Sequence, residues 1–406
     1  MSKSAFLHVL LVTALTCPAE AEVQVNQRTS GAQANPVVAG NKAGGATVVW
    51  SSYYTTSGRS NDILARHVDP NGAFSGDEFV VNLATEGNQT QPAVAIGPTG
   101  RFAVAWESPG PDGEDIALRL FDPNGTPVTE DLLANLRTRG RQIHPRLTVG
   151  GDVFVVAYES REETPDGETT SVYAQLFDPN GNGLGHEILA NPRFSDSRYP
   201  DVAADQTGIL AVTWLRETGT DAIEARLFDV NGVPLTDPFE VSTSRIASVT
   251  RPSIAMNSQG LFVIAWDGDP NLAADDDVHA RLYEPNGLPR GEPFVVNTLR
   301  EGAQQWPQAA VNDANEFVIV WEHDTGDPNT ATDIYARRFD PNGVPLGPEF
   351  PLSTYTFDKQ RAPDVTIAPD GTFIAVWDSD GQDGSGYGVF AHTDRPAPPS
   401  DPNAGP

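Results

Sequence analysis

The fold can be predicted from one stretch, residues 92–106, which reads Pro92-Ala-Val-Ala-Ile-Gly-Pro-Thr-Gly-Arg-Phe-Ala-Val-Ala-Trp106. A short apolar run follows the proline, a Gly-Pro-Thr-Gly turn cluster interrupts it, and a second apolar run ends on tryptophan. Successive side chains of a strand point to opposite faces, and both faces of the second run are apolar. This pattern is typical of a strand that other sheets cover on both sides.

The same stretch occurs seven times, at intervals of 52 to 56 residues, and an aromatic residue follows each proline by thirteen or fourteen positions. In the second unit, a third strand over residues 116–121 and a fourth ending at 132–135 complete the repeat. A period near 50 residues with four strands per unit predicts a β-propeller. The seven prolines, near which the blades are expected to begin, are Pro36, Pro92, Pro145, Pro200, Pro252, Pro307 and Pro363.

An Asp-Pro-Asn-Gly turn separates the third and fourth strands, beginning at Asp69, Asp122, Asp178 and Asp340. Proline fixes one backbone angle, Asn and Gly tolerate the left-handed region, and Asp can accept hydrogen bonds from the backbone ahead of it. A calcium-loop reading fails because the remaining EF-hand ligands and the closing Glu are missing. The turn therefore predicts a tight hairpin.

The seventh unit, from Pro363 to His392, has no fourth strand of its own. Residues 22–26, Glu-Val-Gln-Val-Asn, match the fourth strand of the first unit, residues 78–82. We therefore expect an all-β, single closed seven-bladed β-propeller over residues 22–392, with four antiparallel strands per blade and the N-terminal strand clasping the last blade. Closure of this kind removes exposed strand edges.

Residues 1–21 have the pattern of a secretory signal peptide, with Lys3, an apolar stretch and a small-x-small site at Ala19-Glu-Ala21. Its removal takes away the single cysteine, Cys17, and with it disulfides and thiolate metal sites. The Pro-rich residues 393–406 are predicted to be a disordered tail. We expect a protein that is secreted to the extracellular space or cell surface, with the periplasm as an alternative.

The formal net charge is −29, from 26 Lys and Arg against 55 Asp and Glu. Such a charge disfavours nucleic acid and anionic membranes as partners. No other apolar run approaches the ~20 residues of a membrane span. The expected partner is an extracellular glycan or protein ligand, and the expected state is a monomer.

Two stretches carry a resemblance: Ala375-Val-Trp-Asp-Ser-Asp-Gly-Gln-Asp-Gly-Ser-Gly-Tyr-Gly-Val-Phe-Ala391 and Ile334-Tyr-Ala-Arg-Arg-Phe-Asp-Pro-Asn-Gly343. They resemble a repeat of large bacterial surface and secreted proteins, often found beside calcium-binding or adhesin modules. The resemblance covers residues 22–392 and implies an extracellular propeller module, usually without an assigned activity and with no catalytic motif to transfer. The sialidase Asp-box, Ser-x-Asp-x-Gly-x-Thr-Trp, does not occur in the sequence.

The residue before each repeated proline varies within an otherwise regular repeat. In a propeller, the loops from strand four to the next strand one and from strand two to strand three share one face, here called the mouth face, around the central channel. Ligands usually bind there, on loops held by a rigid scaffold. We therefore predict a non-enzymatic binding module with a ligand site at these residues, the alternative being that each fills its own loop. They are Asn35, Gln91, His144, Tyr199, Arg251, Trp306 and Ala362.

Three of these positions, His144, Tyr199 and Arg251, suggest a second hypothesis. A His or Tyr base beside an Arg that neutralises a carboxylate is the machinery for β-elimination in uronic-acid polysaccharides. A lyase-type, polysaccharide-active enzyme is therefore the alternative function. The competing structural interpretation makes His144 a loop hydrogen bonder and Tyr199 a packed aromatic.

Carboxylates at the ends of the second strands form a second predicted ring near the mouth. Calcium prefers six to eight oxygen ligands, so converging carboxylates are candidates to bind it. The best single candidate is the loop with Asp378, Asp380 and Asp383, the alternative being solvated surface acids. No other cofactor is expected. The ring comprises Glu107, Glu159, Asp267, Glu322 and Asp378.

Overall fold

The structure is a computed structural model that describes residues 22–53, 60–165, 167–192, 196–217, 221–242, 251–268, 275–327 and 331–396. The predicted signal peptide and the tail beyond residue 396 lie outside the described residues. No helix capable of spanning a membrane occurs in the described part of the chain.

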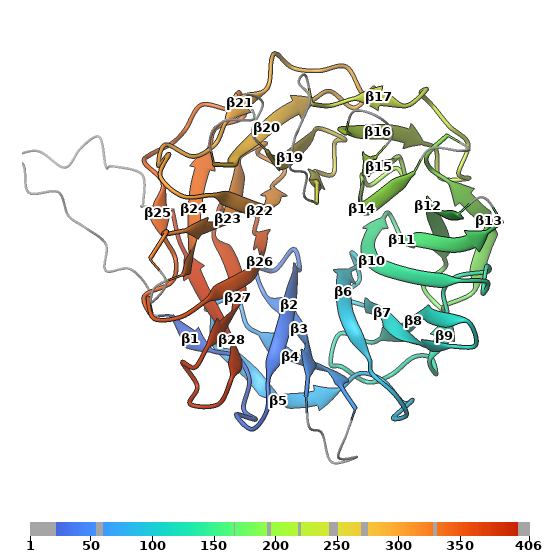
Figure 1. Ribbon diagram of the computed structural model, residues 1–406, viewed down its shortest axis with the longest axis horizontal. Helices are drawn as coiled ribbons and strands as arrows, with labels where there is room; N and C mark the ends of the chain where they lie inside the picture. Colours follow the sequence, from blue (N-terminus) through green and yellow to red (C-terminus); the bar gives the residue numbers. More distant parts are fainter. Residues whose placement is uncertain are drawn as a thin grey trace, which may run out of the picture.

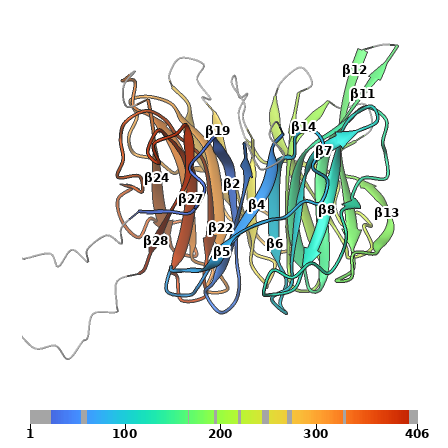
Figure 2. The same ribbon diagram turned by 90° about the horizontal axis from the view of Figure 1, so that it is seen from below.

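Seven four-stranded antiparallel sheets stand around a central axis as the blades of a ring, as predicted (Figure 1). Seen from the side, the strands run between two faces of the ring (Figure 2). Blades one to three comprise β2 (Gln33–Gly40), β3 (Ala46–Ser52), β4 (Asp62–Val68) and β5 (Phe74–Val80); β6 (Thr90–Ile96), β7 (Phe102–Gly110), β8 (Gly113–Phe121) and β9 (Leu132–Leu133); and β10 (Arg141–Gly150), β11 (Val153–Thr164), β12 (Gly167–Phe177) and β13 (Gly183–Leu189).

The remaining blades repeat the same order from the inner to the outer strand. Blades four to six comprise β14 (Ser197–Ala204), β15 (Leu210–Arg216), β16 (Ala222–Phe228) and β17 (Phe239–Glu240); β18 (Ser253–Met256), β19 (Phe262–Gly268), β20 (Asp277–Tyr283) and β21 (Phe294–Val295); and β22 (Gln304–Val311), β23 (Phe317–Asp324), β24 (Thr332–Phe339) and β25 (Phe350–Pro351). Blade seven comprises β26 (Gln360–Ile367), β27 (Phe373–Asp380), β28 (Tyr387–Asp394) and β1 (Val23–Gln24).

The repeated tryptophans fill the space between neighbouring blades. Trp106 of blade two is fully buried and belongs to one apolar cluster with Val49 and Ile63 of blade one. Its indole Nε1 donates to Gln89 Oε1 at 2.8 Å, and Gln89 in turn donates to the Glu86 carbonyl. The indole N–H is therefore satisfied in the core, as a buried polar group must be, and the linker that enters the blade is fixed to it.

The Asp-Pro-Asn-Gly turns form the expected hairpins. Asp69 Oδ1 accepts the N–H groups of Asn71 and Ala73 at 2.8 and 2.9 Å, and Gly72 adopts a φ of 81°. The aspartate thus stabilises its own turn between β4 and β5, which leaves this oxygen no role as a metal ligand.

The fourth strand of blade seven comes from the start of the described chain. β1 pairs with β28, with Val23 opposite Ala391 and Gln24 opposite Phe390. Val25 is fully buried in one apolar cluster with residues of β3 and β27. The last strand also continues to Asp394, two residues beyond the predicted end of the propeller at 392.

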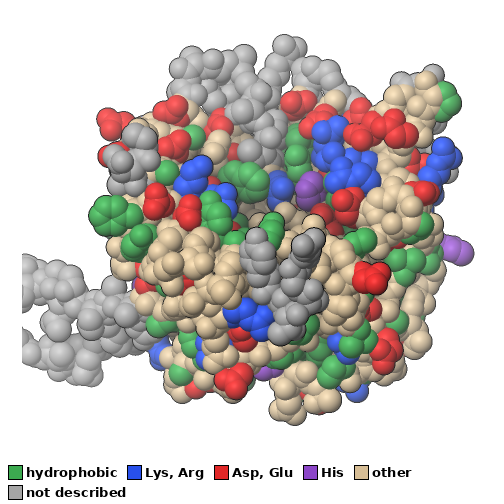
Figure 3. Space-filling model, turned by 60° about the horizontal axis from the view of Figure 1, so that its bottom comes forward, with side chains coloured by type: hydrophobic (Ala, Val, Ile, Leu, Met, Phe, Trp, Pro, Cys, Tyr) green, Lys and Arg blue, Asp and Glu red, His purple; other side chains and the backbone are tan. Residues whose placement is uncertain are grey.

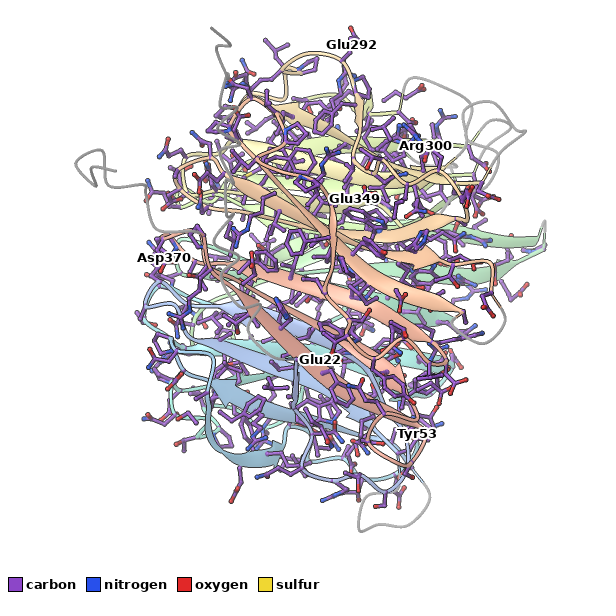
Figure 4. The ribbon with its side chains drawn as sticks, turned by 90° about the vertical axis from the view of Figure 1, so that its left-hand side faces the viewer. Glu22, Tyr53, Glu292, Arg300, Glu349 and Asp370 are labelled. Carbon is purple, nitrogen blue, oxygen red and sulfur yellow. The ribbon has the colours of Figure 1, made fainter. Side chains whose placement is uncertain are left out.

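Glu22 repeats an outer-wall contact that other blades make. Glu349, at the start of the fourth strand of blade six, accepts the N–H groups of Thr298 and Leu299 from the linker of the preceding blade at 2.6 and 2.7 Å. Glu22 accepts the Thr354 N–H, in the linker of blade six, at 2.9 Å. Both acids are labelled in Figure 4. A glutamate before the fourth strand therefore binds the linker of the preceding blade in both places, including the blade that β1 completes.

Candidate functional site

Six of the seven residues before the repeated prolines have an unusual backbone, with a positive φ. The pairing of the first two strands shifts register at this position, as between Ala34 and Val37 in blade one. A side chain in the left-handed region costs about 1–3 kcal/mol, so the surroundings must impose this conformation. The φ angles are 53° for Asn35, 51° for Gln91, 53° for His144, 50° for Tyr199, 57° for Trp306 and 50° for Ala362.

Carboxylates of the preceding blade hold these bulges in place. Glu107 Oε1 accepts the His144 N–H at 2.8 Å. Three further pairs follow the same rule: Glu159 with Tyr199 at 3.0 Å, Glu322 with Ala362 at 2.7 Å, and Asp378 with Asn35 at 3.1 Å. Each of these four acids lies on a second strand and is buried. Four of the five acids of the predicted ring thus form hydrogen bonds between neighbouring blades, whereas Asp267 is buried and burial raises its pKa.

The candidate calcium loop uses its carboxylates within the protein. Asp378 accepts from Asn35 and from the Arg361 guanidinium at 3.4 Å, and burial raises its pKa to about 6. Asp383 accepts from the Asn26 side chain at 3.1 Å and from the Ser385 N–H at 3.0 Å. Among the described residues, no three Asp, Glu, His or Cys side chains gather so as to hold a metal ion. Calcium binding at Asp378, Asp380 and Asp383 stays a hypothesis, which thermal melting in the presence of calcium tests.

Four of the predicted mouth residues form one contiguous row over blades three to six. The rings of His144 and Tyr199 lie 5.0 Å apart. The Arg251 guanidinium carbon lies 5.1 Å from the ring centre of Tyr199 and 4.6 Å from that of Trp306. A guanidinium over two aromatic faces is held by cation–π attraction. This row, His144–Tyr199–Arg251–Trp306, is called the aromatic–arginine row below.

The His144 imidazole is oriented by Glu159. Its Nδ1 lies 3.2 Å from Glu159 Oε2, while Arg161 Nε donates to the other carboxylate oxygen at 2.5 Å. Burial lowers the pKa of His144, and the positive charge of Arg251 lowers it further, against the raising effect of Glu159. The imidazole is therefore neutral at pH 7, donates through Nδ1 and keeps Nε2 as an acceptor.

A cavity of about 330 Å³ lies at the ring axis, lined by the first strands of all seven blades. Its volume is within the range of small-molecule pockets, about 300–1,000 Å³. Five of the predicted residues line it, whereas Tyr199 flanks it through its contact with Arg251, and His144 through its contact with Tyr199. The five are Asn35, Gln91, Arg251, Trp306 and Ala362. We call this space the mouth cavity.

The sequence analysis missed the residue after each proline, which lines the same cavity one step deeper. Asp201 Oδ2 accepts the Ile254 N–H of the next blade at 2.8 Å, and Asp364 Oδ2 accepts the Val38 N–H at 2.7 Å. The sequence signal that could have identified this layer is the presence of polar residues at a position where other repeats have Val37 or Ala93. The polar members are Arg146, Asp201, Ser253, Gln308 and Asp364.

Charge in the mouth cavity is distributed unevenly. Arg146 Nε lies 3.7 Å from Asp201 Oδ1, so this cation has an acidic neighbour. Arg251 forms no ion pair with any acid in the described part of the chain. Burial, followed by the charge of Arg146, lowers the pKa of Arg251 to about 10, and the guanidinium stays protonated at pH 7. In the upper part of Figure 3, basic side chains gather beside a histidine and hydrophobic side chains.

A second cavity, of about 490 Å³, lies toward the opposite face, at the turns between first and second strands. Its polar groups are largely committed to these turns. Asn41 Oδ1, for example, accepts the N–H groups of Ala43 and Gly45 at 2.9 and 3.1 Å. Met256, Val311 and Ile367 border both cavities and form an apolar belt between them. The mouth cavity, with its unpaired arginine, is the better candidate site.

No family model and no curated protein matches this chain. Among solved structures, a protein of unknown function from Dyadobacter fermentans is 11% identical over 93% of this chain and 99% of its own, with a TM-score of 0.54. A fungal alcohol oxidase of the AA5 family, in complex with copper, is 14% identical over 93% and 76%, with a TM-score of 0.55. The α-L-arabinanase of Penicillium chrysogenum, complexed with arabinobiose, is 12% identical over 76% and 93%, with a TM-score of 0.52.

Likeness at these identities shows the fold and carries no residue roles. Membership of the bacterial repeat family stays a prediction. What the strand topology and the solved neighbours establish together is that the chain is an all-β propeller of seven four-stranded blades.

Proposed function

We propose that this protein is an extracellular glycan-binding propeller whose ligand occupies the mouth cavity. The observation that carries the proposal is the aromatic–arginine row, with Arg251 and Trp306 on the wall of that cavity. Aromatic faces match the apolar faces of sugar rings, and a few fixed polar groups can select hydroxyl positions. Asn35 and Gln91 supply such polar groups on the same wall.

A binding role without catalysis is favoured by how the carboxylates are used. Most glycosidases need two carboxyl groups free to act on either side of the scissile bond. Here Glu107 and Glu159 hold the backbone of the next blade. The arabinobiose complex of a solved propeller supports a glycan as the ligand class for this scaffold. The predicted signal peptide supports an extracellular place of action.

A glycan array probed with the full mature chain tests the proposal. We expect binding to at least one oligosaccharide class, weakened ~10- to 100-fold by Trp306→Ala, as for a central aromatic contact. Lys42→Ala, in the second cavity, is the matched control and should bind as the wild type does. Binding that tolerates Trp306→Ala would place the site elsewhere, and a chain that captures only protein ligands would contradict a glycan function.

One observation favours a second function, the lyase alternative. His144, Tyr199 and Arg251 are spatial neighbours in the aromatic–arginine row. Neutral His144, or Tyr199 in its phenolate form, would take the C5 proton of a uronate while Arg251 neutralises its carboxylate. The C5–H electron pair would form the C4=C5 double bond, and the C4–O bond would break, with the departing oxygen taking up a proton.

Absorbance of the unsaturated uronate product separates the two functions. Appearance of this chromophore from anionic polysaccharides, lost in His144→Ala, would establish the lyase and overturn the non-enzymatic proposal. Binding of the same polysaccharides without the chromophore supports the binding function.

A further inference from the structure

Arg251 differs from most arginines of this acidic chain because it forms no ion pair with a described residue. Arg161, for comparison, meets Glu159 at 2.5 Å, and Arg338 meets Asp394 at 2.6 Å. Arg251 instead lies between two aromatic rings on the wall of the mouth cavity, and Glu107 and Glu159 act on it only as more distant charges. A partly buried guanidinium without an ion-pair partner is unfavourable, and an anion that enters the cavity would reduce that cost.

A second cation faces the same space. Arg146 lines the mouth cavity and is close enough to Arg251 for its charge to lower the pKa of that residue. Asp201 Oδ1 is the acidic neighbour of Arg146, but this oxygen also accepts the Val202 N–H at 2.9 Å. The two arginines therefore offer forked donors to one group, and forked donors suit planar carboxylates in particular.

The acids of the cavity limit the charge of the ligand. Asp201 and Asp364 lie on the same wall, and burial raises the pKa of both carboxyl groups, that of Asp364 to about 7. In their ionised forms they repel a group with two negative charges more than a singly charged group, such as a hexuronate or a sulfate ester. Arg251 covers one face of the Trp306 indole at 4.6 Å, so a sugar ring placed against the edge or the other face of the indole has its acidic substituent near the guanidinium.

We infer that the mouth cavity selects acidic sugars, with a carboxylate held by Arg251 and Arg146 and the sugar ring placed against Trp306. The inference rests on the proposed glycan-binding function and adds the ligand class to it. The role given to Arg251 is recognition of charge, and it holds whether or not any turnover follows binding.

Titration calorimetry of the full mature chain with three probes tests the inference. The probes are trigalacturonate, the neutral galactose trimer of the same linkage, and a sulfated form of that neutral trimer. We expect trigalacturonate to bind at least about tenfold more tightly than the neutral trimer, as a charge-assisted hydrogen bond provides. Arg251→Ala should abolish this preference, and Arg251→Lys should keep part of it, because the charge remains but the forked donors do not.

Two controls keep the test decisive. Lys42→Ala, a cation removed from the second cavity, should leave the preference unchanged. Thermal melting checks that each variant is folded, and Arg251→Lys carries the test if Arg251→Ala does not fold.

Each remaining outcome has one meaning. Equal binding of acidic and neutral trimers, unaffected by Arg251→Ala, overturns the inference while the glycan function stands. Preference for the sulfated trimer over trigalacturonate overturns the carboxylate assignment. A chain that binds no glycan of any class refutes the proposed function itself.

Discussion

Replacing Asn26 with alanine should destabilise the whole ring, although the residue lies only a few positions from the start of the described chain. Asn26 Oδ1 accepts the Val389 N–H at 2.8 Å, and Nδ2 donates to the Arg28 carbonyl at 2.8 Å. Asn135, inside the chain, makes the equivalent bonds with Ile116 at 2.7 Å and Arg137 at 2.5 Å. Each Nδ2 also donates to an aspartate, that of Asn26 to Asp383 at 3.1 Å and that of Asn135 to Asp115 at 2.8 Å. The two residues are therefore matched, one at the junction of the chain ends and one within a blade.

The magnitude follows from the bonds that are lost. The substitution leaves the buried Val389 N–H without its partner, which costs about 1–3 kcal/mol, and removes the bonds from Nδ2 to the Arg28 carbonyl and to Asp383, each worth about 0.5–1.5 kcal/mol. We expect a loss of about 2–6 kcal/mol. Unfolding entropy of ~2.1 cal/mol/K per residue over ~370 residues converts this to a fall in Tm of ~3–8 °C.

Differential scanning calorimetry of the wild type, Asn26→Ala and Asn135→Ala measures the effect. If β1 is an integral fourth strand that clasps the ring, the two variants should lose similar amounts. Deletion of residues 22–26 should cost more and promote aggregation, since it also removes buried Val25 and exposes the edge of β28. An unchanged Tm for Asn26→Ala beside a clear fall for Asn135→Ala would refute the clasp.

Three further outcomes can be measured by thermal melting. Burial raises the pKa of Glu322 to about 7, so between pH 4.5 and 7 the folded state keeps a proton that the unfolded chain has released. The Tm should therefore fall as the pH rises from 5.5 to 8. A rise in Tm over this range would contradict the prediction. Gly302→Ala should lower the free energy of unfolding by about 2–5 kcal/mol, because the φ of Gly302 is 76° and a Cβ would meet the Asp324 carbonyl oxygen. Gly326→Ala, in open space at a φ of 70°, should lower it by about 1–2 kcal/mol. Equal losses in the two variants would be inconsistent with this geometry. Millimolar calcium should leave the Tm unchanged, since Asp378 is already hydrogen bonded; at a hundredfold excess over Kd a bound ion would add about 2.7 kcal/mol and reveal itself.

The fold could be predicted from the sequence because the repeat determines it. A proline, two apolar runs, a terminal tryptophan and a fixed turn recur at one period, so each unit reports the same four strands. The segment that supplies the fourth strand of blade seven could also be predicted, because residues 22–26 repeat the pattern of the other outer strands. What periodicity fixes is the local structure of a blade and the number of blades.

Contacts between blades could be predicted less well, because they depend on distances that the repeat does not encode. Glu107 is visible in sequence as an acid at a strand end, but the approach of the His144 N–H from the next blade is not. The acids therefore suggested metal ligands, whereas they hold strained backbone.

The mouth cavity shows the same division. Asn35, Gln91, Arg251, Trp306 and Ala362 could be assigned to it because their register is repeated. The deeper layer with Arg146 was missed, since the residue after each proline belongs to the regular strand pattern and only its polarity marks it. That Arg251 lacks an acidic partner depends on the packing of side chains from several blades.

The central claim, that the mouth cavity binds an acidic sugar, is tested most directly by a crystal structure of the protein with trigalacturonate. We expect the sugar at the ring axis, with a carboxylate on the guanidinium of Arg251 and a ring against Trp306. Sugar bound instead in the second cavity or on the outer wall, with the mouth cavity free of it, would contradict the claim.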